Sequence, residues 1–185
     1  MIAYVFWHWR KNSVAALDYE NRQQEFHSSL AATPPAGFST SFSLRVAGAP
    51  WVADGLEAYE DWYIVNDFSA LGALNEGAVS GSRSAPHDAA ANAAEGGAGG
   101  LYLLRQGVPL TKPRFALWFS KPAAMSYPEL LGRLDPVVAG RGGALWMRQL
   151  VFGPAREFCI HAVRDVSLPP PFETVTPEIR NVWPR

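Results

Sequence analysis

The chain has 185 residues, 48% of them hydrophobic, and a formal net charge of −1 at pH 7. This length suffices for a sizeable hydrophobic core. The balanced charge excludes the basic surface of a nucleic-acid-binding protein, and no segment is a basic amphipathic helix of the membrane-surface kind. No run approaches the roughly 18 apolar residues of a membrane span, so we expect a soluble protein without nucleic-acid or membrane partners.

The cysteine content bounds the compartment and the metal chemistry. Cys159 is the single cysteine, which excludes a disulfide framework within the chain and any multi-cysteine metal site. A chain without disulfides fits a reducing compartment, and we therefore expect a cytoplasmic protein.

The first segments predict a strand followed by a helix. Residues 2–9 are β-branched and aromatic, which is typical of a strand. Asn12 or Ser13 is expected to cap the helix that follows. This helix should end before Pro34 and Pro35, which break helical hydrogen bonding.

Two further strands are predicted at 38–46 and 60–67. The first alternates strictly between apolar and polar residues, as expected for a strand with one dry and one polar face. A short helix from Ser69 is predicted to follow the second strand. Together with the preceding elements, these strands give a β-α-β-β unit.

Residues 80–100 are rich in glycine, alanine and serine. Ser84 is expected to cap a short helix through residues 87–91, and the glycine run at 95–100 is expected to end it. A fourth strand should then occupy 101–105. We interpret the glycine run as a linker, with a mobile lid over a site as the alternative.

The second part of the chain repeats this order. Residues 114–120 predict a strand, and Ser126 with Glu129 forms a capping box at the start of a helix that Pro136 should distort. Strands are expected at 144–152 and 156–164. The proline-rich tail, 168–185, is expected to be extended and docked by Phe172 and Trp183.

The two parts can be matched to each other by pattern. Phe6-Trp7 corresponds to Leu117-Trp118, and residues 60–65 correspond to 156–161. With this internal duplication, the chain resembles the dimeric α+β barrel superfamily of ferredoxin-like proteins. The resemblance implies an α+β fold in which two ferredoxin-like β-α-β-β repeats place their antiparallel sheets face to face as a pseudo-dimeric α+β barrel. The halves would span residues 1–109 and 110–165, followed by a tail at 166–185.

The alternation also predicts where a binding site would lie. We expect the dry faces to pack against the helices; they comprise Phe42, Leu44, Trp62, Ile64, Met147, Phe158 and Ile160. The opposite faces would then hold Ser41, Ser43, Arg45, Tyr63, Trp146, Arg148, Cys159 and His161, and by the repeat also Trp7 and Trp118.

Trp7, Arg45, Trp118 and Arg148 are therefore the candidate ligand-binding residues. They would suit a small aromatic or anionic molecule, because guanidinium groups grip carboxylates and indole rings stack. The alternative is a sheet-on-sheet interface in which both arginines pair with carboxylates such as Asp67.

For catalysis, His161 and Tyr63 are the candidate proton-transfer residues, with an arginine holding an oxyanion. No histidine pair has the spacing of a metal motif, so no metal site is predicted. We expect no cofactor, and leave haem open because the related families include haem proteins, with His161 or His27 as its ligand. The helical haem ligand of those families is not matched by His161, which lies on a predicted strand.

Three functions remain open from the sequence. The protein could be an enzyme acting on a small molecule, a non-catalytic small-molecule binder, or a structural or assembly protein that uses the same sheet face as an interface. The incomplete fourth strand of the second half would leave an open sheet edge, from which we expect a homodimer.

Overall fold

In the computed structural model, which describes residues 1–52 and 57–184, nine antiparallel strands form one sheet. The strand order is β8-β5-β7-β6-β4-β1-β3-β2-β9. The α+β class is thus confirmed. The elements are β1 (Ile2–Arg10), α1 (Ala16–Ala32), β2 (Phe38–Ala47), β3 (Ala58–Val65), α2 (Phe68–Ala78), a 3₁₀ turn (Gly81–Arg83), α3 (Ser84–Ala93), β4 (Ala94–Gly107), β5 (Phe115–Phe119), α4 (Tyr127–Gly140), β6 (Ala144–Arg148), β7 (Phe158–Ala162), β8 (Thr174–Val175) and β9 (Glu178–Trp183).

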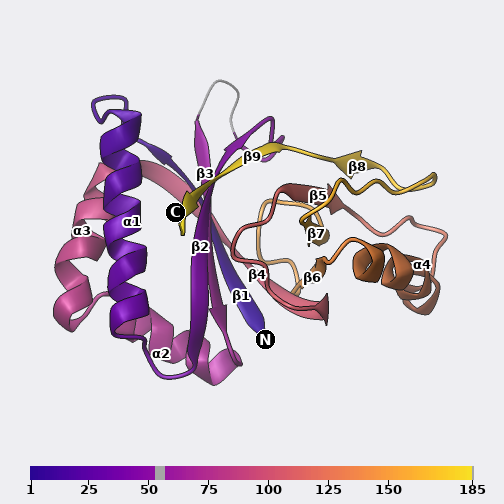
Figure 1. Ribbon diagram of the computed structural model, residues 1–185, viewed down its shortest axis with the longest axis horizontal. Coiled ribbons are helices and arrows are strands. Elements are labelled where there is room, and N and C mark those ends of the chain that lie inside the picture. Colours follow the sequence, from indigo (N-terminus) through magenta and orange to yellow (C-terminus); the bar gives the residue numbers. More distant parts are fainter. Residues whose placement is uncertain (53–56, 185) are drawn as a thin grey trace.

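The helices cover the outer faces of two strand groups. Helices α1, α2 and α3 lie on one side of β1–β4, and α4 lies beyond β5–β7 at the other end of the molecule (Figure 1). Between the two strand groups is a core to which both contribute. Its large side chains are Trp7, Phe42, Leu44, Trp62, Ile64, Tyr102, Trp118 and Trp146. We call this layer the inner core.

The C-terminal tail connects the two ends of the strand order. Val175 of β8 pairs with Trp118 of β5, and Ile179 of β9 pairs with Val46 of β2. The tail therefore covers an edge of each strand group, and the proline-rich segment is docked as expected. Phe172 is buried against the α4 core, and the Trp183 ring lies 6.4 Å from that of His27.

Several helix boundaries differ from the sequence prediction. The N-cap of α1 is Ala15, not Asn12 or Ser13, and that of α3 is Arg83 rather than Ser84. Ser126 is confirmed as the N-cap of α4, because the Glu129 amide donates to Ser126 Oγ over 3.3 Å, whereas the Glu129 carboxylate pairs with Arg133. Pro136 lies inside α4, which nevertheless continues to Gly140.

The glycine run at 95–100 is part of a strand and not a linker. It belongs to β4, which pairs with β1 from Ala94 onward. The rings of Phe6 and Tyr4 on β1 lie across Gly97 and Gly99, where a Cβ atom would collide with them. Aromatic rings of the neighbouring strand thus occupy the space that β4 side chains would take.

The face assignment was wrong for β2 and β3. Phe42, Leu44, Trp62 and Ile64 lie in the inner core, on the same face as Trp7 and Trp118. Tyr63 packs instead with the residues beneath the helices. For β7 the prediction is confirmed, since Phe158 and Ile160 pack with α4 while Cys159 faces the inner core.

We expect Gly97→Ala to lower the free energy of unfolding by about 1–3 kcal/mol, because the added methyl meets Phe6 and the Trp7 carbonyl. Gly132→Ala on α4 is the matched control, since nothing lies within 4 Å of that Cβ position. The control should be stabilised by about 0.5–1 kcal/mol. Urea unfolding measures both, and equal shifts in the two variants would contradict the close contact at Gly97.

Candidate functional site

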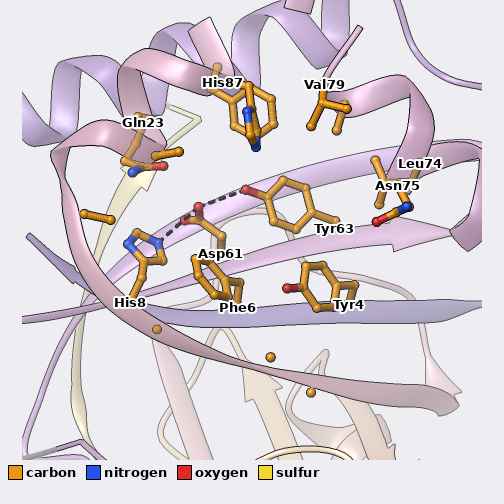
Figure 2. A pocket seen from close by; sticks show the side chains of 18 of the residues that line it. Tyr4, Phe6, His8, Gln23, Asp61, Tyr63, Leu74, Asn75, Val79 and His87 are labelled. Atoms are coloured by element: carbon orange, nitrogen blue, oxygen red, sulfur yellow. Dashed lines mark hydrogen bonds and ion pairs between the residues drawn. The ribbon is translucent and has the colours of Figure 1, made fainter. Parts of the chain in front are cut away.

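A cavity of about 1040 Å³ lies between the helices α1–α3 and the outer face of β1, β3 and β4 (Figure 2). Its floor is formed by strand residues, among them Tyr4, Phe6 and Tyr63. Gln23, Leu74 and His87 approach from the helices (Figure 2). The cavity is thus built almost entirely by the first 101 residues, with Phe152 as the contribution of the second part.

Small residues on the helices explain why this space is not filled. The space above Gly97 and Gly99 of β4 is taken by the rings of Phe6 and Tyr4, but the helices α2 and α3 present only Ala78, Ala90 and Ala91 here. Large side chains at these helical positions would pack between helix and sheet, as the close packing of protein interiors requires. Their absence leaves the helices and the sheet apart over β1 and β4.

The floor is a row of nearly parallel rings. Tyr4 stacks on Phe6 and on Tyr63 with interplanar angles of 20° and 24°, and Phe6 stacks on His8 at 20°. Tyr4 and Phe6 lie across the glycines of β4 and cover this part of the strand. Both rings also line the cavity.

A buried carboxylate sits within this floor. Asp61 lies opposite Phe6 in the β1–β3 register and is 1% exposed. Its Oδ2 accepts a hydrogen bond from the Tyr63 hydroxyl over 2.9 Å and lies 3.1 Å from His8 Nε2 (Figure 2). Its Oδ1 lies 3.4 Å from His27 Nε2.

The surroundings of Asp61 keep it ionised. Burial alone would raise the pKa of this carboxyl, but the imidazoles of His8 and His27 hold the pKa well below its usual range. Burial and the neighbouring Asp61 carboxylate raise the pKa of Tyr63 well above its usual value. The phenol therefore remains a hydrogen-bond donor to a carboxylate.

The two imidazoles are themselves held in place. His8 Nδ1 lies 2.6 Å from the Tyr19 hydroxyl, and His27 Nδ1 lies 2.7 Å from Ser41 Oγ. Each ring is thereby fixed between a hydroxyl group and the same carboxylate. Such supported networks orient the groups that line a site.

The lining combines carboxylates with the imidazoles of His8 and His87. Asp61 and Glu95 contribute carboxylates, whereas no lysine or arginine is found among the described residues that line the cavity. The remaining polar groups include the side chains of Gln23, Asn75 and His87, which are labelled in Figure 2. The cavity thus combines an aromatic floor, apolar walls and a few convergent polar groups.

The structure separates the residues that the sequence analysis had grouped as one site. Tyr63 lies in the cavity floor. Trp7, Trp118 and His161 lie on the opposite side of the sheet, in or against the inner core. Because a strand residue projects to one face only, His161 and Tyr63 do not share a site.

The two candidate arginines are also placed away from the cavity. Arg45 forms an ion pair with Glu57, and its Nη1 lies 3.9 Å from Glu20. Arg148 donates to the backbone carbonyl oxygens of Gly153 and Ala155 in the turn between β6 and β7, over 3.3 and 2.7 Å. The carboxylate pairing of Arg45 agrees with the interface alternative, with Glu57 rather than Asp67 as partner. Asp67 instead caps α2 through the Ala70 amide.

The inner core holds its own ionisable groups. Glu60 accepts hydrogen bonds from Trp7 Nε1 over 2.8 Å and from Trp62 Nε1 over 3.3 Å. Burial raises the pKa of Glu60 to about 7, although both indole donors favour the ionised form. Burial also lowers the pKa of His161 to about 3, so this imidazole is neutral. Burial, and then Glu60, raise the pKa of Cys159 well above its usual value, which makes its thiol unreactive.

Neither histidine suits a haem iron. His161 is fully buried, with its ring 4.5 Å from that of Trp62. Both ring nitrogens of His27 are already near polar atoms of Ser41 and Asp61. Within residues 1–52 and 57–184, no group of three or more His, Cys, Asp or Glu side chains could hold a metal ion.

Comparison with known proteins gives no relative. No protein-family model matches the chain, and no curated protein sequence is significantly similar to it. Among the helices of the described residues, none is long and apolar enough to cross a membrane.

Sequence reasoning missed the residues at the centre of this site, His8 and Asp61. One signal was present: Tyr4, Phe6 and His8 alternate with Val5 and Trp7, which gives β1 a second aromatic face. The carboxylate at position 61, in the middle of an apolar strand, was a second signal, because a buried charge requires partners.

We expect Glu60→Gln to change how stability depends on pH. Between pH 4.5 and about 7 the unfolded chain has released the Glu60 proton while the folded protein retains it. The contribution of Glu60 to the free energy of unfolding therefore falls by about 3 kcal/mol as pH rises through this window. His161 opposes this trend, since its contribution falls as pH decreases from 6.5 toward 3.

Urea unfolding between about pH 4 and 8 should show the free energy of unfolding of Glu60→Gln rising relative to the wild type up to about pH 7, and then levelling off. Glu25→Gln, at an exposed position on α1, is the control and should follow the wild type. A constant offset between Glu60→Gln and the wild type at every pH would show that Glu60 is not protonated in the folded state.

Proposed function

We propose that this protein binds a small, largely apolar or aromatic molecule in the cavity between α1–α3 and the sheet. The observation that carries this proposal is a cavity of about 1040 Å³ with an aromatic floor and a buried, hydrogen-bonded carboxylate. Binding sites for small molecules are typically concave, mostly apolar and furnished with a few fixed polar groups.

An anionic ligand does not fit this cavity. That expectation rested on Arg45 and Arg148, whose side chains are engaged with Glu57 and with a turn of the backbone. The aromatic part of the expectation is retained, because the rings of Tyr4 and Phe6 offer stacking surfaces.

We further propose that the two halves are ferredoxin-like units that form a pseudo-dimeric α+β barrel. The orders β4-β1-β3-β2 and β8-β5-β7-β6 correspond strand by strand, which supports this proposal. So does the contact between the two equivalent tryptophans, whose ring centres lie 5.9 Å apart. Under this proposal the interior of the barrel is a packed core, and the ligand cavity lies outside it, beneath the helices.

In the structural or assembly alternative, the sheet face that bears Trp7 and Trp118 would form an interface between proteins. In the folded chain Trp7 and Trp118 pack against each other instead. The homodimer expectation rested on an open edge, which β8 covers through Trp118 and Phe119. We therefore give preference to small-molecule binding, and keep the expectation of a reducing compartment from Cys159.

A neutral fluorescent probe tests the proposal directly. N-phenyl-1-naphthylamine should bind saturably, with one probe per chain and an increase in its fluorescence. Gly72→Phe should weaken this binding by at least about tenfold, because Gly72 lines the cavity and its Cβ position has open space around it.

Gly132→Phe is the matched control for the cavity-filling variant. Gly132 is also an exposed helical glycine with nothing within 4 Å of its Cβ position, but it lies on α4 and is not among the lining residues. Probe affinity should be unchanged in this variant. Non-saturable binding, or equal affinity in the two variants, would refute the proposed site.

A further inference from the structure

We infer that the ligand of this cavity carries a positively charged group, such as a protonated amine, which sits over the aromatic floor near Asp61. This inference rests on the proposed function, since it specifies the ligand class of the same cavity. Four features of the described residues support it.

The first feature is the charge balance. Asp61 and Glu95 are the acidic residues of the lining; its basic side chains among the described residues are the imidazoles of His8 and His87, and none is a lysine or arginine. Two carboxylates without a permanent positive charge in the lining favour a cationic ligand over its neutral and anionic analogues.

The second feature is the ionised state of Asp61. A buried carboxyl would ordinarily avoid its charge by taking up a proton. Here His8 and His27 lie 3.1 and 3.4 Å from its oxygens, and Tyr63 donates a hydrogen bond to it. The negative charge is thereby maintained directly beneath the cavity floor.

The third feature is the accepting capacity that remains at this carboxylate. Both partners with short contacts, His8 and Tyr63, are directed to Oδ2, whereas among the described residues Oδ1 has only the longer contact of 3.4 Å with His27 Nε2. A carboxylate that is fully buried and only partly paired is stabilised further by an added positive charge.

The fourth feature is the position of the rings. Phe6 and Tyr4 lie across Gly97 and Gly99 and line the cavity, and Phe6 is directly opposite Asp61 in the β1–β3 register. The face of an aromatic ring carries negative charge density and attracts cations. A cation over this floor would meet ring faces and the field of Asp61 together.

An isosteric series of probes tests the charge of the ligand. We would measure by calorimetry the affinities of 1-naphthylmethylamine, 1-naphthylmethanol and 1-naphthoate near pH 7, where the amine is protonated and the acid is ionised. The amine should bind roughly tenfold more tightly than the alcohol, and the carboxylate more weakly than either. Added salt should reduce the advantage of the amine.

Two variants connect this preference to the cavity. Asp61→Asn keeps the side-chain shape, removes the charge, and should bring the affinity of the amine close to that of the alcohol. Glu95→Gln, at an exposed position, should reduce the preference in part, while Glu25→Gln on α1 should leave it unchanged. Because Glu95→Gln and Glu25→Gln both change exposed residues, their comparison tests the charge preference even if Asp61→Asn does not fold.

The outcomes separate the two proposals. Equal affinities for amine and alcohol, or tightest binding of the carboxylate, would overturn the charge inference. If Gly72→Phe still weakened the binding of these probes in that case, the proposed binding site would stand. If no member of the series bound, or if Gly72→Phe had no effect on binding, the proposed function and the charge inference would both fall.

Discussion

The burial of both faces of β3 is the constraint on which the rest of the structure depends. Every residue of this strand is buried, so the neighbouring residues Glu60 and Asp61 project into different compartments. Glu60 enters the inner core and is met by two indole donors. Asp61 enters the space beneath the helices and is met by two imidazoles and a phenol. One strand thus carries, in adjacent positions, an acid whose pKa is raised by burial and an acid whose pKa is lowered by its partners.

Much of the architecture follows from sequence alternation, and its main error has a definite physical origin. Trp7 pairs with Glu60 across β1 and β3, and Trp118 pairs with Cys159 across β5 and β7. If the two tryptophans correspond, Glu60 corresponds to Cys159, whereas the sequence match had set Glu60 against Arg156. The two matches therefore differ by three residues. A shift by an odd number of residues moves every side chain of a strand to the other face of the sheet. The strands β1–β3 and β5–β7 were thus located correctly, while the faces of β2 and β3 were exchanged.

The cavity could not be predicted in the same way, because it results from side chains that are absent. Alanines on α2 and α3 and glycines on β4 have the composition of a linker, and the glycine run was interpreted as one. Only the register shows that Phe6 lies opposite Gly99, and that Asp61 lies on the other side of Phe6. Pairings between residues so distant in sequence are set by tertiary packing, which local patterns do not encode.

The position of β9 has a consequence for how the chain is made. This strand pairs with β2, and its residues 178–183 leave the ribosome after those of every other described strand. During synthesis, the edge of β2 therefore stays uncovered while the remainder of the sheet is being produced. Pairings between distant segments form slowly, and an unpaired strand edge is prone to association with other chains. The nascent protein thus has a period of vulnerability to aggregation that ends only when its final strand docks.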